Sequence, residues 1–421
     1  MVNIENKGTT RVNILEKDEE TYMHPSAGQL LPPWTKGTMD IHHINTGRGD
    51  STFMIFPDGT TMILDAGSID PTAPRTNSPR NTPPRPNGDR QPGEWIARYI
   101  AHIHPDKTSP RVDYAVISHF HSDHMGALSS VSPMSKSANY HLTGITEVAE
   151  HIEIDTLLDR GYPNYDYPEQ LLTDPRNANY HAFIDWQIRK NGMRVQRFQP
   201  GRNDQIVLRK NRRSYPDFEV RNIVANGEVW TGVGACTRHI LPPIEYLELD
   251  EYPCENACSI GLRISYGKFD YFNGGDITGI IDLGDPLWLD IETPVAQAVG
   301  PVEVNVLNHH GNRSSVNEYY LRALRPRVHI LSVWSSDQPG QDVLRRILSE
   351  KLYPGPKDVF ATNILESNRL VIGELIDQIT CDRGHILVRV EPNGDFYWII
   401  ILDDTSESFE ITGVFGPYES R

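Results

Sequence analysis

Apolar runs separated by turn-forming residues divide most of this chain into short strands and helices. Residues 40–46, 52–56 and 61–64 read as three strands, because Gly-rich and Asp-Gly turns separate them. Residues 114–117 are short, branched and continuously apolar, which predicts a buried strand. Apolar side chains at helical spacing predict a helix over 94–103.

Strands and helices return in the second half of the chain. The expected strands are 259–266, 268–272, 302–307, 328–334, 384–390 and 395–402. The expected helices are 316–324 and 343–352, the second with its apolar residues on one face. Mixed strands and helices of this kind indicate an α/β protein.

Three segments lack this regularity. Residues 1–39 show no clear periodicity and predict an extended N-terminal arm, so that one domain would span 40–421. Residues 70–93 are rich in Pro, Asn and Arg, as expected of a flexible loop or of a lid over a substrate. Residues 135–250, with candidate helices at 145–158 and 180–190, predict an insert or cap segment.

Directly after the apolar run at 114–117, three histidines and an aspartate fall within six positions: His119, His121, Asp123 and His124. Alternation along an extended backbone places His119 and His121 on the same side. His124 lies beyond the turn and can serve a neighbouring position together with Asp123. A lone histidine is more often a satisfied polar side chain, but this density at a strand end predicts a binuclear metal site.

This cluster resembles the signature of the metallo-β-lactamase fold superfamily of metal-dependent hydrolases. Other pieces follow in the family's order: Ile63-Leu64-Asp65-Ala66-Gly67, Phe272-Asn273-Gly274-Gly275-Asp276 and Val306-Leu307-Asn308-His309-His310-Gly311. Within the superfamily, Gly47-Arg48-Gly49-Asp50-Ser51 and the His-His-Gly turn are most similar to the soluble domain of competence (ComEC-like) DNA-uptake proteins and its stand-alone relatives. The resemblance covers roughly residues 40–130 and 250–400 and implies an αββα sandwich.

The resemblance also assigns roles to residues. His119 and His121 would hold one ion, Asp123 and His124 the other, and Asp276 would bridge both. The last ligand is His309 or His310, and the sequence does not choose between them. Asp65 would orient a ligand imidazole, and Asp65 and Asp123 are the expected catalytic residues. The implied cofactors are two divalent ions, zinc or manganese.

Two departures from the family pattern affect this assignment. Many members place another histidine before the bridging aspartate, and by position His141, His151, His181 and His239 are candidates here. The competence-type relatives instead have an Asn, which Asn256 resembles. They also place a His-Pro where this chain has Gln338-Pro339, and an amide cannot donate a proton as an imidazolium does. His385 is the alternative proton donor.

Composition limits the partners. A formal net charge of −16 argues against nonspecific coating of nucleic acid. No stretch approaches the roughly 20 apolar residues of a membrane span, and the N-terminus has no secretory-type segment, so we expect a cytoplasmic protein and no membrane partner. A local basic concentration in the insert is usually a solvated face, but it can also bind an anionic substrate. The candidates are Arg209, Lys210, Arg212 and Arg213.

Three classes of function remain open. The first is hydrolysis of a phosphodiester, in a nucleotide or nucleic acid, by a hydroxide shared between two divalent ions. The second is hydrolysis of an ester, lactone or amide, because the same nucleophile attacks carbonyl groups. The third is a non-catalytic binding protein with a degenerate metal site. Fold alone does not separate them, and the oligomeric state is not indicated.

Overall fold

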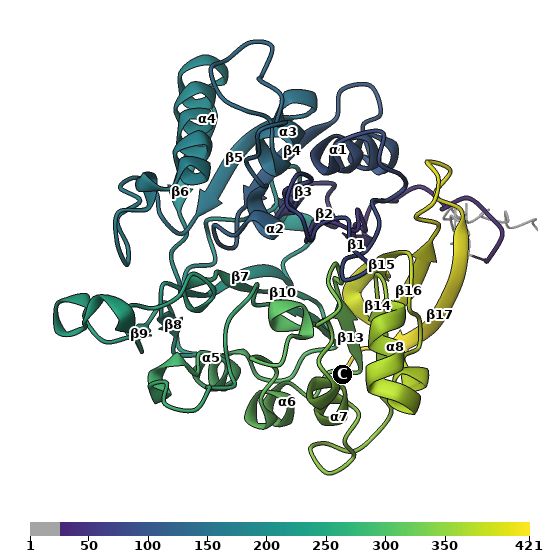
Figure 1. The fold of residues 1–421 in the computed structure, drawn as a ribbon. Coiled ribbons are helices and arrows are strands. Elements are labelled where there is room, and N and C mark those ends of the chain that lie inside the picture. Colours follow the sequence, from purple (N-terminus) through teal and green to yellow (C-terminus); the bar gives the residue numbers. More distant parts are fainter. Residues whose placement is uncertain (1–25) are drawn as a thin grey trace, which may run out of the picture.

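Two mixed β-sheets pack face to face in the computed structural model, which describes residues 26–421 (Figure 1). The first sheet contains β1 (Met39–His43), β2 (Thr52–Ile55), β3 (Thr61–Leu64), β4 (Arg111–Val116), β5 (Glu153–Asp159), β6 (Arg194–Arg197), β15 (His385–Val390), β16 (Phe396–Leu402) and β17 (Ile411–Glu419). The second contains β7 (Phe218–Ala225), β8 (Glu228–Trp230), β9 (Thr237–His239), β10 (Gly261–Tyr266), β11 (Phe269–Asn273), β12 (Val304–Val306), β13 (Val328–Leu331) and β14 (Asp358–Ala361).

Each sheet has a parallel part and an antiparallel part. The order of the first is β17-β16-β15-β1-β2-β3-β4-β5-β6, parallel from β3 to β6. The order of the second is β14-β13-β12-β11-β10-β7-β8-β9, parallel from β11 to β14. Because parallel neighbours end at the same edge, the residues that follow β3 and β4 lie together, as do those that follow β11 and β12.

Helices cover the two outer faces. α1 (Pro92–Ile103), α3 (Gly144–His151) and α4 (Pro175–Asn191) pack on the first sheet, and α5 (Glu292–Val299), α6 (Glu318–Leu324) and α7 (Gln341–Ile347) on the second. α8 (Glu366–Ile372) lies beyond β14, and the short α2 (Ser122–Met125) follows β4 (Figure 1). This arrangement confirms the predicted α/β class and its αββα layers.

Burial on both faces explains why the central strands are continuously apolar. In β3, Met62 and Leu64 point into the core between the sheets, whereas Ile63 points toward α1. In β4, Tyr114 and Val116 point inward in the same way, and the residue between them points outward. A strand covered on both sides has no polar face to alternate with, so its sequence reads as an unbroken apolar run.

The middle of the chain differs from its prediction. Residues 135–250 do not form a separate cap: they supply β5 and β6 to the first sheet and β7, β8 and β9 to the second. The helix expected at 145–158 ends at His151, and its second half is β5, whose branched Ile154 and Thr156 suit a strand. The sequence does not show that this segment belongs to the sheets, because β6 is largely polar and lacks the apolar pattern of a strand.

The predicted N-terminal arm lies in part outside the described residues, which begin at 26. Within them, Gly28 and Gln29 exchange backbone hydrogen bonds with Ile411 at the start of β17. Leu30 forms an isolated bridge with Glu410. This part of the arm therefore runs along the C-terminal edge strand. Among the described helices, none combines the length and apolar character that crossing a membrane requires.

Candidate metal centre

The metal-binding candidates lie at one edge of the sandwich, after strands from both sheets. Asp65 follows β3 directly, and the stretch from His119 to His124 follows β4 and enters α2. Asp276 comes three residues after β11, and His309 and His310 come shortly after β12. The carboxyl ends of two pairs of parallel strands thus deliver histidines and carboxylates to one place.

The side chains divide into two groups that share one carboxylate. In the first group, called site 1, ligand atoms of His119, His121 and Asp276 lie within 4.8 Å of one another. In the second, called site 2, the same holds for Asp123, His124, Asp276 and His310. The sequence predicted this division, with Asp276 common to both groups.

Hydrogen bonds to Asp65 determine which nitrogens of two histidines face the centre. Ser118 Oγ donates to Asp65 Oδ2 at 2.6 Å, so this hydroxyl can only accept from His119 Nδ1, which lies 3.1 Å away. His124 Nδ1 donates to Asp65 Oδ2 at 2.8 Å. With Nδ1 protonated, the Nε2 atoms of His119 and His124 carry lone pairs when the rings are neutral. Asp65 thus sets two imidazoles for metal binding.

His310 is oriented by a backbone carbonyl. Its Nδ1 donates to Ser332 O at 3.0 Å, which leaves Nε2 as an acceptor. That atom lies 3.3 Å from His124 Nε2 and 3.1 Å from Asp123 Oδ2. Two lone-pair nitrogens and a carboxylate oxygen at these distances repel one another unless a cation or a proton lies between them.

An unsatisfied atom supports the same conclusion. Asp276 Oδ1 is buried and, among residues 26–421, makes no hydrogen bond of acceptable geometry, although His124 Nε2 lies 3.2 Å away. A buried carboxylate oxygen without a partner is costly. Imidazole nitrogens and carboxylate oxygens are the usual ligands of zinc and of similar divalent ions. The residues present therefore fit two divalent cations.

The electrostatics of the centre favour positive charge. Burial works against a charged imidazole at His124, but the carboxylates of Asp276, Asp65 and Asp123 raise its pKa well above the ordinary value. Burial also disfavours an ionised Asp276, yet His124 and His310 hold its pKa well below the usual range. Metal binding would replace these protons with cations.

The structure distinguishes the two adjacent histidines. The His310 side chain is 1% exposed and belongs to site 2. The His309 side chain is 24% exposed, and its Nε2 lies 3.9 Å from Asp276 Oδ2. The same Nε2 lies 3.2 Å from Asn256 Nδ2, while Nδ1 lies 2.8 Å from Ser314 Oγ. His310 is therefore the better ligand, and His309 with Asn256 borders site 1.

Two glycines allow neighbouring backbone segments to approach Asp123. A Cβ atom at Gly49 would lie 2.4 Å from Asp123 O, and one at Gly67 would lie 1.8 Å from it. Asp50 N donates to the same carbonyl at 2.7 Å. The Gly-Arg-Gly-Asp and Asp-Ala-Gly motifs thus contact the backbone at the start of α2 and hold Asp123 in position.

Trp334 contacts the centre and was not predicted from the sequence. Its indole Nε1 donates to Asp123 Oδ2 at 3.0 Å. Gln338 accepts from the backbone N–H groups of Trp334 and Ser335 at 2.8 and 3.0 Å. Gln338 therefore shapes the turn that presents the indole. The position of a tryptophan at the end of the apolar run 328–334 is the sequence feature that could have indicated this contact.

Glu255 supports the strand end that carries the first two histidines. It accepts from Phe120 N at 2.7 Å and from Arg160 Nε at 2.8 Å. Arg160 is fully buried and also donates to Asn226 Oδ1 at 3.0 Å. No sequence motif marked these residues, because their partners lie on strands that are distant in the chain.

The segment predicted as a flexible loop or lid lies against the centre. Thr82 N donates to Trp334 O at 3.0 Å, and Arg85 N donates to Thr46 O at 2.8 Å. Asn81 forms an isolated bridge with Ser335. The contacts of Asn81 and Thr82 join this segment to the turn that carries Trp334, and the bond of Arg85 joins it to the loop after β1.

The other candidate histidines are not brought to the cluster. His141 bonds Ser132 O, and His181 faces Asp185 on α4. His151 groups with Glu94 and Glu147, away from the centre. His239 lies on the edge strand β9. His385 accepts from Asn45 N and packs on Tyr99, so the alternative proton donor named above is wrong in position.

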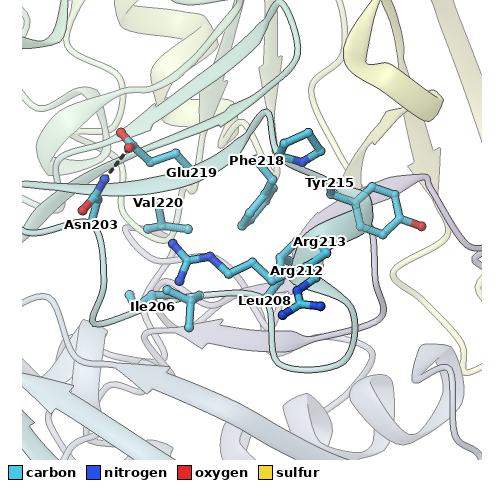
Figure 2. Close-up of a pocket in the computed structure, with 11 residues that line it drawn as sticks. Asn203, Ile206, Leu208, Arg212, Arg213, Tyr215, Phe218, Glu219 and Val220 are labelled. Carbon is cyan, nitrogen blue, oxygen red and sulfur yellow. Dashed lines mark hydrogen bonds between the residues drawn. The ribbon is translucent and has the colours of Figure 1, made fainter.

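The basic residues predicted to bind substrate also lie elsewhere. Arg209 pairs with Asp155 and donates to Thr156, and Lys210 Nζ donates to Gly59 O. The β2–β3 turn that contains Gly59 is at the opposite end of β3 from Asp65. Arg212 and Arg213 line a cavity with neither metal site in its lining (Figure 2). The structure therefore does not bring these four residues to the metal centre.

No protein-family model matches the chain, and no curated protein matches it. Among solved structures, it is similar to CmlA, a diiron β-hydroxylase from Streptomyces venezuelae, with 13% identity and a TM-score of 0.37 over 86% of this chain and 55% of that one. It is also similar to a diphosphatase of the PhnP family, with 11% identity and a TM-score of 0.32 over 85% and 98%. The chain thus spans about half the length of CmlA. The family itself stays a prediction from the motifs.

Proposed function

We propose that this protein is a metal-dependent hydrolase with two divalent ions, which acts on phosphodiesters. The observation that carries the proposal is the pair of ligand groups that share Asp276. His119, His121 and Asp276 would hold one ion, and Asp123, His124, His310 and Asp276 the other. Such a pair of ions lowers the pKa of a water molecule and polarises the bond under attack.

The chain's own residues position this chemistry. Asp65 keeps the Nε2 atoms of His119 and His124 directed to the centre through the Nδ1 bonds described above. Trp334 holds Asp123 Oδ2. With these side chains buried or packed, little reorganisation is needed when the ions and the substrate bind.

Two arginines close to the candidate ligands in the sequence or by contact support an anionic substrate. Arg176 Nη1 donates to Ser122 Oγ at 2.8 Å, and Ser122 lies between His121 and Asp123 in the sequence. Arg176 Nη2 also pairs with Asp174 Oδ2 at 3.1 Å, so its charge is partly balanced. Arg313 follows the His309-His310 turn, is exposed, and has no carboxylate within 4 Å among residues 26–421. A guanidinium group suits the paired oxygens of a phosphodiester.

The ligand set favours zinc or manganese. It consists of imidazoles and carboxylates, and no cysteine belongs to either group in the described part of the chain. Mixed nitrogen and oxygen ligands suit both metals, whereas thiolates would select softer ones. We propose one of these two metals as the cofactor.

A carbonyl substrate is the second candidate. The four basic residues predicted to bind a polyanion lie away from the centre, which removes one argument for nucleic acid as the substrate. Gln338 occupies the position of a proton donor and is used in a turn. Esters and lactones with good leaving groups need less help from an acid.

Substrate profiling tests the proposal. The metal-loaded protein should hydrolyse bis-p-nitrophenyl phosphate faster than p-nitrophenyl acetate or a lactone panel. Replacement of Arg176 and Arg313 by Gln should raise KM for the phosphodiester by about tenfold and leave the neutral ester unchanged. Arg202→Gln, on an exposed residue that pairs with Asp204, is the matched control. Faster turnover of the carbonyl compounds would reverse the order of the two candidates, and metal binding without turnover of any compound would favour the binding protein.

A further inference from the structure

The loop between β6 and β7 and the first residues of β7 enclose a cavity of about 360 Å³ (Figure 2). Its apolar lining comes from Ile206, Leu208 and Val220, which are 1%, 5% and 1% exposed. Tyr215 and Phe218, both partly buried, add aromatic surface. A cavity of this size is near the lower end for small-molecule sites, so it fits a small ligand.

Arg212 and Arg213 give this cavity a positive charge. Their side chains line it next to one another, and within residues 26–421 neither has a carboxylate within 4 Å (Figure 2). Asp204, whose field reaches Arg212, is itself paired with Arg202 at 2.6 and 2.7 Å. Two guanidinium groups that line the same hollow, each without a paired carboxylate among the described residues, therefore give it a positive potential.

The acid in the cavity lining does not neutralise these arginines. Glu219 is bound by Arg221, whose Nε and Nη2 donate to it at 3.0 and 2.9 Å. Asn203 Nδ2 also donates to Glu219 Oε2, at 2.6 Å. The charge of Glu219 is thus balanced outside the pair Arg212 and Arg213, and the cavity keeps a positive excess.

The neighbouring basic residues show why Arg212 and Arg213 differ. Arg209 is held by Asp155 and Thr156 and stacks on Tyr114 at 4.1 Å. Lys210 Nζ is held by Gly59 O. Arg209 and Lys210 therefore hold the loop in place through these bonds. Arg212 and Arg213, which line the cavity, form no ion pair within residues 26–421.

We propose that this cavity is a second binding site, separate from the metal centre, for a small organic anion with a flat apolar body. The two guanidinium groups would bind the sulfonate, phosphate or carboxylate of such a ligand. Its ring would lie against Tyr215 and Phe218, the partly buried aromatic residues of the lining. A bare inorganic anion would leave the apolar lining unused, and a neutral ring would leave the arginines unpaired.

Position separates this site from the metal centre. The loop is anchored at the β2–β3 turn, where Lys210 N and Asn211 N donate to Asp58 Oδ2 at 2.8 and 2.7 Å. From Gly59 to Asp65, β3 and its flanks span about 20 Å at about 3.3 Å per residue. Ligand binding at Arg212 and Arg213 should therefore not need the metal ions.

Calorimetric titration of the full chain tests the proposal with 2-naphthalenesulfonate, 2-naphthol and sulfate. We expect one site for 2-naphthalenesulfonate, at least about tenfold tighter than the other two, and unchanged after chelation of divalent ions. Arg212→Ser with Arg213→Ser should weaken binding at least tenfold. Arg98→Ser is the control and should change nothing, because Arg98 pairs with Glu407 and does not line the cavity.

Three results would overturn the proposal. The first is binding of equal strength in the double variant with an unchanged melting temperature. The second is equal affinity for sulfate and 2-naphthalenesulfonate, which would indicate a nonspecific charged surface. The third is a double variant that loses affinity for a single-stranded oligonucleotide but not for 2-naphthalenesulfonate, which would make this face a nucleic-acid surface. Because both arginines are exposed, the double variant should fold normally.

Discussion

Ser118 and Asp65 are joined by two hydrogen bonds at the edge of the metal centre. Ser118 N donates to Asp65 Oδ1 at 2.7 Å, and its hydroxyl donates to Oδ2 at 2.6 Å. The pair links the end of β3 to the end of β4 and fixes the Nδ1 protons of His119 and His124. Asp65 would therefore act on bound metals through these two imidazoles, since it belongs to neither group of candidate ligands.

Replacing Asp65 by Asn should weaken metal affinity by about 10–100-fold, because the amide binds Nδ1–H less strongly. The metal should still bind at saturating concentration, since all ligands remain. Isothermal titration with zinc or manganese measures this change. Asp113→Asn is the control: Asp113 bonds the other end of β3, at Thr61, and its variant should bind metal normally. Unchanged affinity in Asp65→Asn would remove this role from Asp65.

The two adjacent histidines should behave differently. His310→Ala should lower the metal content by about one ion per chain, because it removes a buried ligand of site 2. His309→Ala should keep most of the metal, since this partly exposed ring borders site 1 with Asn256. The number of divalent ions per chain, measured for the two purified variants, decides which histidine is the ligand. A larger loss in His309→Ala would exchange their roles.

Glu147 should make the stability of the fold depend on pH. Burial and the nearby Glu94 raise the pKa of Glu147 to about 7. The folded state therefore holds this proton more tightly than the unfolded state, and stability falls as the pH rises from about 4.5 to about 7. Glu147→Gln removes that loss and should be more stable than the wild type at pH 8, by up to about 3 kcal/mol, and equal to it at pH 4.

Urea unfolding at the two pH values measures the effect of Glu147. Glu169→Gln is the control, because Glu169 is exposed and its replacement should change stability little at either pH. A Glu147→Gln variant that is less stable than the wild type at pH 8 would show that the ionised carboxylate stabilises the fold.

Local patterns were enough to predict most of the fold and the placement of the candidate ligands at strand ends. The histidine cluster, Asp276 and the His309-His310 turn each follow an apolar strand that can be recognised by itself, so sequence order places them at strand ends. β3 and β4 were equally clear because both of their faces are buried. The division of the candidate ligands into two groups with a common Asp276 was implied by the family resemblance that these motifs carry.

Long-range packing accounts for what the sequence did not show. β6 is a polar edge strand, so the stretch from 135 to 250 lacked the signal that would have joined it to the sheets. Arg209 and Lys210 look like a cationic patch in the sequence, but Asp155 and Gly59 O, distant in the chain, hold them. Ser118, Trp334 and Glu255 gain their roles only from partners on other strands.

Metal analysis of the wild type and of Asp276→Ala tests the central claim most directly. Asp276 is the one carboxylate common to both groups, and it is 2% exposed. The wild type, purified without chelator, should carry about two divalent ions per chain, and Asp276→Ala should carry less than one while keeping its fold by circular dichroism. A wild type that binds no divalent ion, or an Asp276→Ala variant with the full count, would contradict the account.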